Sequence, residues 1–158
     1  MSMTTTMLDP KGRLGPSGFR NAALILIVAG TILSILSVLN PALMLLSFVS
    51  LALIYPWVVI WSKRLHDAGK SGWMFLLVLV LYLVATFTAS YFIGQQFGPP
   101  VDPNADFQQM MAAMTEAAQA TAIPTTIASI VISLAFVFAG NALLKSDPGP
   151  NAYGPAPA

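Results

Sequence analysis

The 158-residue sequence contains no cysteine, one histidine and few charged side chains. The lack of cysteine excludes disulfide bonds, thiolate metal sites and a cysteine nucleophile. Because His66 is the only histidine, a metal site built from several histidines of one chain is excluded as well. Charged residues make up 8% of the chain, whereas a soluble domain has about a quarter. They are too few to cover a water-facing surface, and we expect neither a metal nor a cofactor.

What the chain has in abundance is apolar sequence: 56% of its residues are hydrophobic. Four long apolar segments lack Asp, Glu, Lys, Arg and His; they cover residues 22–39, 42–61, 73–92 and 123–144. About 20 helical residues span a hydrocarbon core of about 30 Å, and a spanning segment must satisfy its own backbone hydrogen bonds. The sequence therefore predicts an all-α membrane protein with a membrane domain of four transmembrane helices over residues 19–144.

The connections predict how these helices are arranged. Asn40-Pro41 separates the first two segments and is typical of a tight turn between helices, so we expect two antiparallel hairpins. Pro56 lies inside the second segment. Because proline removes a hydrogen bond and crowds the carbonyl four residues earlier, it predicts a kink in that helix.

A shorter amphipathic helix is predicted between the third and fourth segments, at about residues 106–120. Its apolar side chains recur at helical spacing: Phe107, Met110, Met111 and Met114. Asp106 or Asn104 can cap its first turn. The helix can lie on the membrane interface or cover the bundle, and the sequence leaves both open.

The charges predict the topology. All seven basic residues fall before the first segment, between the second and third, or after the fourth: Lys11, Arg13, Arg20, Lys63, Arg64, Lys70 and Lys145. The connection between the third and fourth segments carries only Asp102, Asp106 and Glu116. Under the positive-inside rule, residues 1–18, the loop between the second and third helices, and the Pro/Gly-rich tail 145–158 are cytoplasmic.

The sequence RLHDAGKSGW, residues 64–73, allows three interpretations. A phosphate-binding loop requires glycine five residues before Gly69, and Arg64 stands there, so that interpretation fails. A catalytic pair of His66 and Asp67 would need a carboxylate within about 3 Å of the imidazole, which adjacent helical residues do not supply. A turn between helices fits best, with Gly69 as a left-handed cap and Ser71 capping the next helix.

This loop faces the same predicted surface as the N-terminal segment and the tail. Asp67 could pair with Arg13 or Arg20 and fix the geometry of this end. The residues that we expect to form a basic, aromatic-edged surface are Arg13, Arg20, Lys63, Arg64, His66, Asp67, Gly69, Lys70, Ser71, Gly72, Trp73, Asn151, Tyr153 and Gly154. They form either a contact site for anionic lipid head groups or a protein partner, or a structural latch.

Three motifs carry a resemblance to a known family. GRL at residues 12–14, RLHDAGKSGW at 64–73 and NAYGP at 151–155 are similar to the YhaH/YhaI-type small bacterial inner-membrane proteins, a domain-of-unknown-function family. The resemblance extends from about residue 8 to residue 157. The helix-1 motif departs from the family pattern, which tends to carry a second arginine and an aromatic pair. The resemblance implies a multi-span inner-membrane protein and supplies no activity.

Three functions are compatible with this sequence. The favoured one is a non-enzymatic structural or interaction protein, with membrane lipids and a membrane protein or a second copy as partners and no nucleic acid. The alternative is a small oligomeric transporter or channel subunit with Pro56 as a gating kink, although no span carries the ionisable residue that marks most ion paths. The least favoured is a lipid-directed enzyme using His66 and Asp67.

Overall fold

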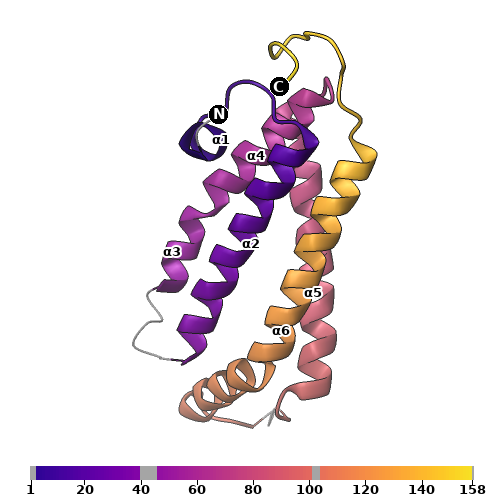
Figure 1. Ribbon diagram of the computed structural model, residues 1–158. Helices are drawn as coiled ribbons and strands as arrows, with labels where there is room; N and C mark the ends of the chain where they lie inside the picture. Colours follow the sequence, from indigo (N-terminus) through magenta and orange to yellow (C-terminus); the bar gives the residue numbers. More distant parts are fainter. Residues whose placement is uncertain (1–2, 40–45, 101–103, 158) are drawn as a thin grey trace.

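The computed structural model describes residues 3–39, 46–100 and 104–157, and their regular elements are helices. In chain order these are α1 (Met3–Leu8), α2 (Pro16–Leu39), α3 (Leu46–Ala52), α4 (Ile54–Asp67), the short 3-10 helix η2 (Gly72–Met74), α5 (Phe75–Phe97) and α6 (Phe107–Leu143). In Figure 1 the long helices run side by side along one axis, and both chain ends lie at the same end of the bundle. We call this the terminal end.

Among the described residues, four helical stretches are long and apolar enough to cross a membrane: Pro16–Ser37, Phe48–Asp67, Gly72–Phe97 and Phe107–Leu143. Their surfaces carry many exposed large apolar side chains, as expected where lipid tails take the place of water. The prediction of an all-helical protein with four membrane-length apolar helices is confirmed.

Several helices extend beyond the predicted bounds. α2 begins at Pro16, six residues before the apolar segment, because proline suits the first helical turn, where its missing N–H has no partner to lose. α4 continues past the apolar segment to Asp67, because Lys63, Arg64 and Asp67 are buried and find partners within the protein. α5 continues to Phe97, five residues beyond the predicted end.

The second spanning stretch is divided near its proline. α3 ends at Ala52 and α4 begins at Ile54. Pro56 has no N–H to donate to the Ala52 carbonyl, and instead the Leu53 N–H bonds to the Ser50 carbonyl at 3.0 Å, in a tighter turn. The division lies where Pro56 predicted a kink. The predicted turn at Asn40-Pro41 lies outside the described residues.

α6 unites two helices that the sequence analysis separates, the amphipathic helix and the fourth span. The Asp106 side chain accepts from the Gln109 N–H at 2.8 Å, and the Gln109 side chain accepts from the Asp106 N–H at 3.0 Å, which forms a capping box. Pro124 lies inside the helix, and Figure 1 shows the first part of α6 turned across the far end of the bundle. The apolar side chains of this part are exposed rather than covered by the bundle: Phe107, Met110, Met111 and Met114.

The packed core lies toward the terminal end. Phe19 of α2 meets Trp61 of α4 edge to face, with ring centroids 4.7 Å apart. Gly140 of α6 faces the same indole so closely that a Cβ there would lie 2.4 Å from Trp61 Cη2. This contact requires glycine, and it brings α2, α4 and α6 together directly beneath the polar residues of the terminal end.

Candidate functional site

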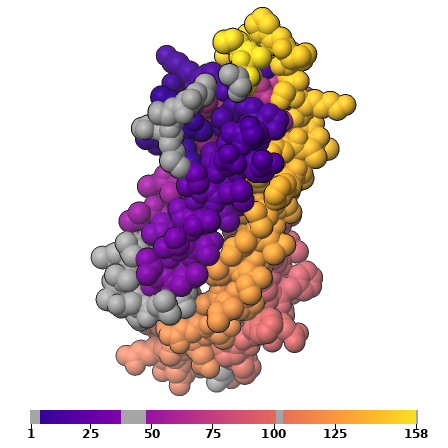
Figure 2. All heavy atoms as spheres, viewed as in Figure 1, coloured from indigo at the N-terminus to yellow at the C-terminus, as the bar shows by residue number. Residues whose placement is uncertain are grey.

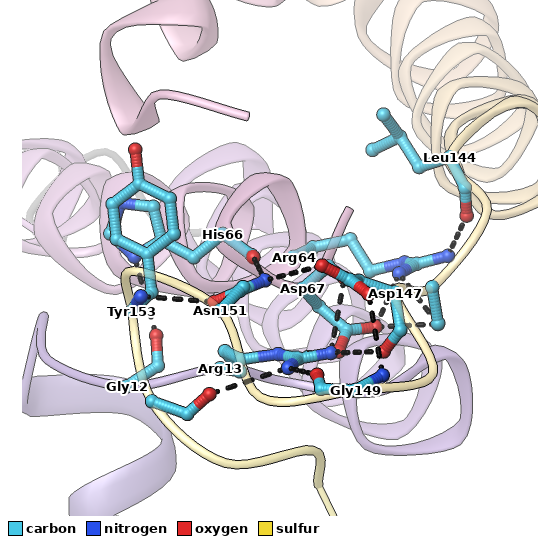
Figure 3. Close-up of polar contacts among 12 residues, drawn as sticks. Gly12, Arg13, Arg64, His66, Asp67, Leu144, Asp147, Gly149, Asn151 and Tyr153 are labelled. Atoms are coloured by element: carbon cyan, nitrogen blue, oxygen red, sulfur yellow. Dashed lines mark hydrogen bonds and ion pairs between the residues drawn. The ribbon is translucent and has the colours of Figure 1, made fainter. Parts of the chain in front are cut away.

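The three sequence motifs meet at the terminal end (Figure 3). Arg13 comes from the segment before α2, Arg64 and Asp67 from the last turn of α4, and the tail follows α6. Arg13, Arg64 and Asp67, called here the Arg–Asp–Arg cluster, are 2%, 0% and 0% exposed. Sequence alone left Arg13 and Arg20 as alternative partners of Asp67, and the structure pairs it with Arg13.

Both oxygens of the Asp67 carboxylate accept strong hydrogen bonds. Oδ1 lies 3.2 Å from Arg13 Nε and 3.0 Å from Arg13 Nη2, so the arginine donates twice to one oxygen. Oδ2 lies 2.8 Å from Arg64 Nη1 and 2.5 Å from Ser146 Oγ. Charge-assisted bonds of this kind are stronger than neutral ones. The Asp67 carboxylate therefore links three parts of the protein: the segment before α2, helix α4 and the tail after α6.

The cluster holds more positive than negative charge, and main-chain carbonyls and a side-chain amide accept further hydrogen bonds from the two arginines. Arg13 Nη2 donates to the Asp147 carbonyl at 2.5 Å, and Nη1 donates to the Gly149 carbonyl at 2.6 Å. Arg64 donates to the Leu144 carbonyl and, at 3.1 Å, to Asn141 Oδ1. The two arginines thus fix the path of the chain after α6. Figure 2 shows this tail seated at the same end as the N-terminal residues.

His66 connects the RLHDAGKSGW loop to the NAYGP turn of the tail. Its ring stacks on Tyr153, with centroids 3.9 Å apart and planes 5° from parallel. Asn151 Nδ2 donates to the His66 carbonyl at 3.0 Å, and the backbones of Asn151 and Gly154 bond to each other in both directions at 3.0 Å. Gly154 has φ +126°, a backbone conformation that favours glycine. The NAYGP turn is thereby fitted to the end of α4.

His66 and Asp67 turn to separate contacts. His66 Nδ1 lies 3.2 Å from the Gly12 carbonyl, whereas the Asp67 carboxylate is occupied by Arg13, Arg64 and Ser146. The side-chain pair that the lipid-directed enzyme would use is therefore not formed. In the part of the chain that the structure describes, no group of three His, Cys, Asp or Glu side chains could hold a metal ion.

Lys63 holds the N-terminal segment through hydrogen bonds. Its side chain is 1% exposed, and Nζ donates to the carbonyls of Thr5 at 2.8 Å and Asp9 at 3.2 Å. The Lys63 carbonyl accepts from the Leu14 N–H at 3.1 Å. The sequence predicts an accessible Lys63, but the structure buries its ammonium group against α1 and the residues that follow it.

The lysines and arginines of the terminal end thus fall into two sets, one buried and one exposed. Arg13, Lys63, Arg64 and Asp67 are buried and bonded within the protein, which corrects their assignment to an accessible surface. The exposed cations of this end are Lys11, Arg20, Lys70 and Lys145. We refer to these four residues as the exposed cations. Two of them, Lys11 and Lys145, are not among the residues that the sequence predicts for the basic surface.

The loop after α4 presents its tryptophan outward. Gly69, at φ +67°, ends the helix in the left-handed conformation that the sequence predicted. Ser71 Oγ accepts from the Trp73 N–H at 3.4 Å, and Trp73 is 80% exposed. A Cβ on Gly72 would lie 3.0 Å from His66 Nε2, so glycine lets the loop close over the imidazole. An exposed tryptophan beside basic residues is typical of a membrane–water interface.

Four apolar helices and a polar, cation-bearing end define a multi-pass membrane protein. Residues 7–155 match the family model described as Protein of unknown function (DUF805), and the chain belongs to this family. The match confirms the resemblance to a domain-of-unknown-function family and is consistent with its YhaH/YhaI-type designation. Neither a curated protein nor a solved structure matches the chain.

Proposed function

We propose that this protein is a non-enzymatic inner-membrane protein whose terminal end faces the cytoplasm and binds anionic lipid head groups. One observation carries the proposal. Three cations of this end, Arg13, Lys63 and Arg64, are buried and donate hydrogen bonds within the protein. The other four, Lys11, Arg20, Lys70 and Lys145, are exposed. One of the four, Lys70, lies three residues before the outward-facing Trp73 in the same loop.

The charge distribution supports the orientation. The amphipathic part of α6, at the opposite end, carries the exposed Asp106 and Glu116, whereas the exposed lysines and arginine lie at the terminal end. Cytoplasmic segments close to membrane helices carry an excess of Lys and Arg. We therefore infer two antiparallel hairpins with both termini in the cytoplasm, and an amphipathic segment whose apolar face rests on the outer interface.

The expected affinity follows from the number of exposed cations. A basic residue near an anionic leaflet contributes about 1 kcal/mol, so four of them contribute at most about 4 kcal/mol, or roughly a thousandfold in binding. Salt weakens the attraction, because the screening length falls from about 10 Å at 0.1 M to about 3 Å at 1 M. Binding should therefore be selective for anionic over zwitterionic lipid and sensitive to salt.

Native mass spectrometry of the protein released from lipid nanodiscs tests the proposal. In mixed phosphatidylglycerol and phosphatidylcholine, the unaltered protein should retain anionic lipid preferentially. A variant with all four exposed cations changed to glutamine should lose this preference, and Glu116→Gln at the opposite end is the matched control. Equal retention by the four-site variant would refute the proposal. Loss of a bound protein instead of a lipid would favour the partner interpretation.

The orientation is testable separately, because the chain has no cysteine to interfere. Cysteine is introduced singly in place of Lys70 or of Glu116, and inverted vesicles, whose outer side is the cytoplasmic side, are treated with a membrane-impermeant maleimide. The cysteine at position 70 should react from outside, and the cysteine at position 116 should react only from the inside. Labelling of both from the same side would contradict the proposed topology.

The alternative, a small oligomeric transporter or channel subunit, has less support. A central cavity exists, but within the described residues its lining includes no Asp, Glu, Lys, Arg or His. Ion and proton paths through membranes usually rely on such groups. Uptake by purified protein in liposomes, compared with protein-free liposomes, distinguishes this alternative from lipid binding.

A further inference from the structure

A cavity of about 510 Å³ lies among α2, α4, α5 and α6, apart from the terminal-end site. Its walls include Leu26 on α2, Trp57 and Trp61 on α4, Leu79 on α5 and Phe136 on α6. All of these residues belong to the stretches that are long and apolar enough to cross a membrane. The cavity therefore lies at a depth where the surrounding solvent is lipid.

The chemistry of the lining points to an apolar occupant. Most of the hydroxyl groups in the lining bond within the protein: Ser34 Oγ lies 3.3 Å from Thr126 Oγ1, and the Tyr82 hydroxyl lies 3.1 Å from Ser133 Oγ. Thr126 Oγ1 also donates to the Ala122 carbonyl at 2.8 Å. These groups leave no strong demand for a polar ligand, and the rest of the wall is mainly aliphatic and aromatic.

The cavity is too large to remain empty in a stable bundle. Ligand pockets range from about 300 to 1,000 Å³, and an engineered apolar cavity of about 150 Å³ already binds benzene. Vacant apolar space destabilises a fold in proportion to its volume. Water is a poor occupant of an apolar space surrounded by lipid, because it needs several polar partners.

The packing of the helices provides a side opening. α5 packs chiefly on α6, while α3 packs on α2 and α4, and among the described residues α3 and α5 make no extensive contact. Ile54 at the start of α4 and Leu83 on α5 both line the cavity and are exposed. Because exposed lining residues come from both α4 and α5, the cavity opens sideways between these two helices, toward the acyl chains of a bilayer.

We propose that one acyl chain of a bilayer lipid enters this opening and occupies the cavity as part of the folded protein. The chain would extend past Gly30 toward Trp61, which is 5% exposed and closes the cavity at its terminal end. This site is independent of head-group charge, so it does not rest on the proposed function.

Trp61 is a built-in reporter of the acyl chain. The protein has three tryptophans, and Trp57→Phe combined with Trp73→Phe leaves only the buried one. This variant is reconstituted in phosphatidylcholine with bromine atoms along its acyl chains, and in the same lipid without bromine. Bromine quenches an indole at close range. We expect the brominated bilayer to remove most of the Trp61 fluorescence.

A pair of glycine substitutions separates a chain inside the cavity from lipid around the protein. Gly30→Phe projects a ring into the cavity, where an added Cβ meets no atom closer than Leu53 Cδ1 at 4.0 Å. Gly94→Phe is the matched control, because Gly94 lies on α5 outside the cavity with no atom within 4 Å of an added Cβ. Gly30→Phe should restore the Trp61 fluorescence, and Gly94→Phe should leave it quenched.

Two results would overturn the proposal: an unquenched Trp61 in brominated lipid, or equal quenching in the Gly30→Phe and Gly94→Phe variants. The second result would mean that bromine reaches the indole from outside. Ser129→Phe fills the cavity from α6 and repeats the comparison if Gly30→Phe does not give a monodisperse protein. The zwitterionic lipid keeps the result separate from anionic head-group binding.

Discussion

Replacement of Asp67 by asparagine should be among the most destabilising changes at the terminal end. The carboxylate is 0% exposed and accepts from Arg13, Arg64 and Ser146. Asparagine nearly preserves the shape, but it offers one acceptor oxygen and turns an NH₂ group toward donors. Two buried guanidinium groups then have no counter-charge. Removing one partner from a buried ion pair costs about 3–5 kcal/mol, and we expect Asp67→Asn to lose that amount of unfolding free energy.

The loss can be measured as a melting temperature in detergent, followed by the fraction of monodisperse protein after heating. For a chain of this length, about 3–5 kcal/mol corresponds to a decrease on the order of 10 °C. Asp9→Asn is the control: Asp9 is exposed at the same end, and its side chain accepts from the Lys11 N–H at 2.9 Å. It should change the stability by less than about 0.5 kcal/mol.

The reasoning would be refuted if Asp67→Asn and Asp9→Asn had the same small effect. A second check uses coupling. Arg13→Gln and Asp67→Asn remove members of one contact, so together they should lose less free energy than the sum of the two separate losses. Strict additivity would mean that the Arg13–Asp67 contact contributes nothing to stability.

Other predictions concern packing, the tail and the far end. Gly140→Ala should lose about 1–3 kcal/mol by crowding Trp61, whereas Gly94→Ala, in open space within a helix, should gain up to about 1 kcal/mol; equal thermal stability of the two would argue against the close contact. Tyr153→Ala should lose the stack on the His66 imidazole and speed tryptic cleavage at the tail up to about tenfold, whereas Tyr153→Phe should keep the stack and the normal cleavage rate. Equal cleavage rates for the two variants would contradict a tail held by stacking. Asp106→Ala should cost about 1 kcal/mol at the start of α6, seen as faster hydrogen exchange at residues 107–110 with α5 unchanged; uniform exchange would disprove the cap.

The elements with a strong periodic or compositional signal were predictable from sequence. The apolar segments identify the four membrane-length helices, because the cost of unpaired backbone in lipid leaves helix as the available structure. Asp106 and Gly69 lie at their predicted caps, since such positions depend on a few neighbouring residues. The division beside Pro56 follows from the missing N–H of a single residue.

Whether a polar residue of the terminal end is buried or exposed was not predictable from sequence, because burial depends on contacts between distant segments. A lysine or arginine at a membrane helix end is equally suited to water, to lipid head groups and to a buried partner. The burial of Lys63 rests on carbonyls near α1, more than fifty residues earlier, and that of Arg64 on the tail. Main-chain carbonyls carry no residue-specific signal, so the sequence could not indicate that the tail supplies them. The cavity was not predictable for a similar reason, since residues from four helices far apart in the sequence line it.

The central claim is that the buried cluster stabilises the fold while the exposed cations bind anionic lipid. Its most direct test is the increase in melting temperature when phosphatidylglycerol replaces phosphatidylcholine, because a ligand that binds only the folded protein raises its stability. The unaltered protein should show the increase, and Asp67→Asn should show the same increase from a lower starting temperature. The variant with glutamine at Lys11, Arg20, Lys70 and Lys145 should start normally and show none. An increase that survives in the four-site variant, or that disappears only in Asp67→Asn, would contradict the account.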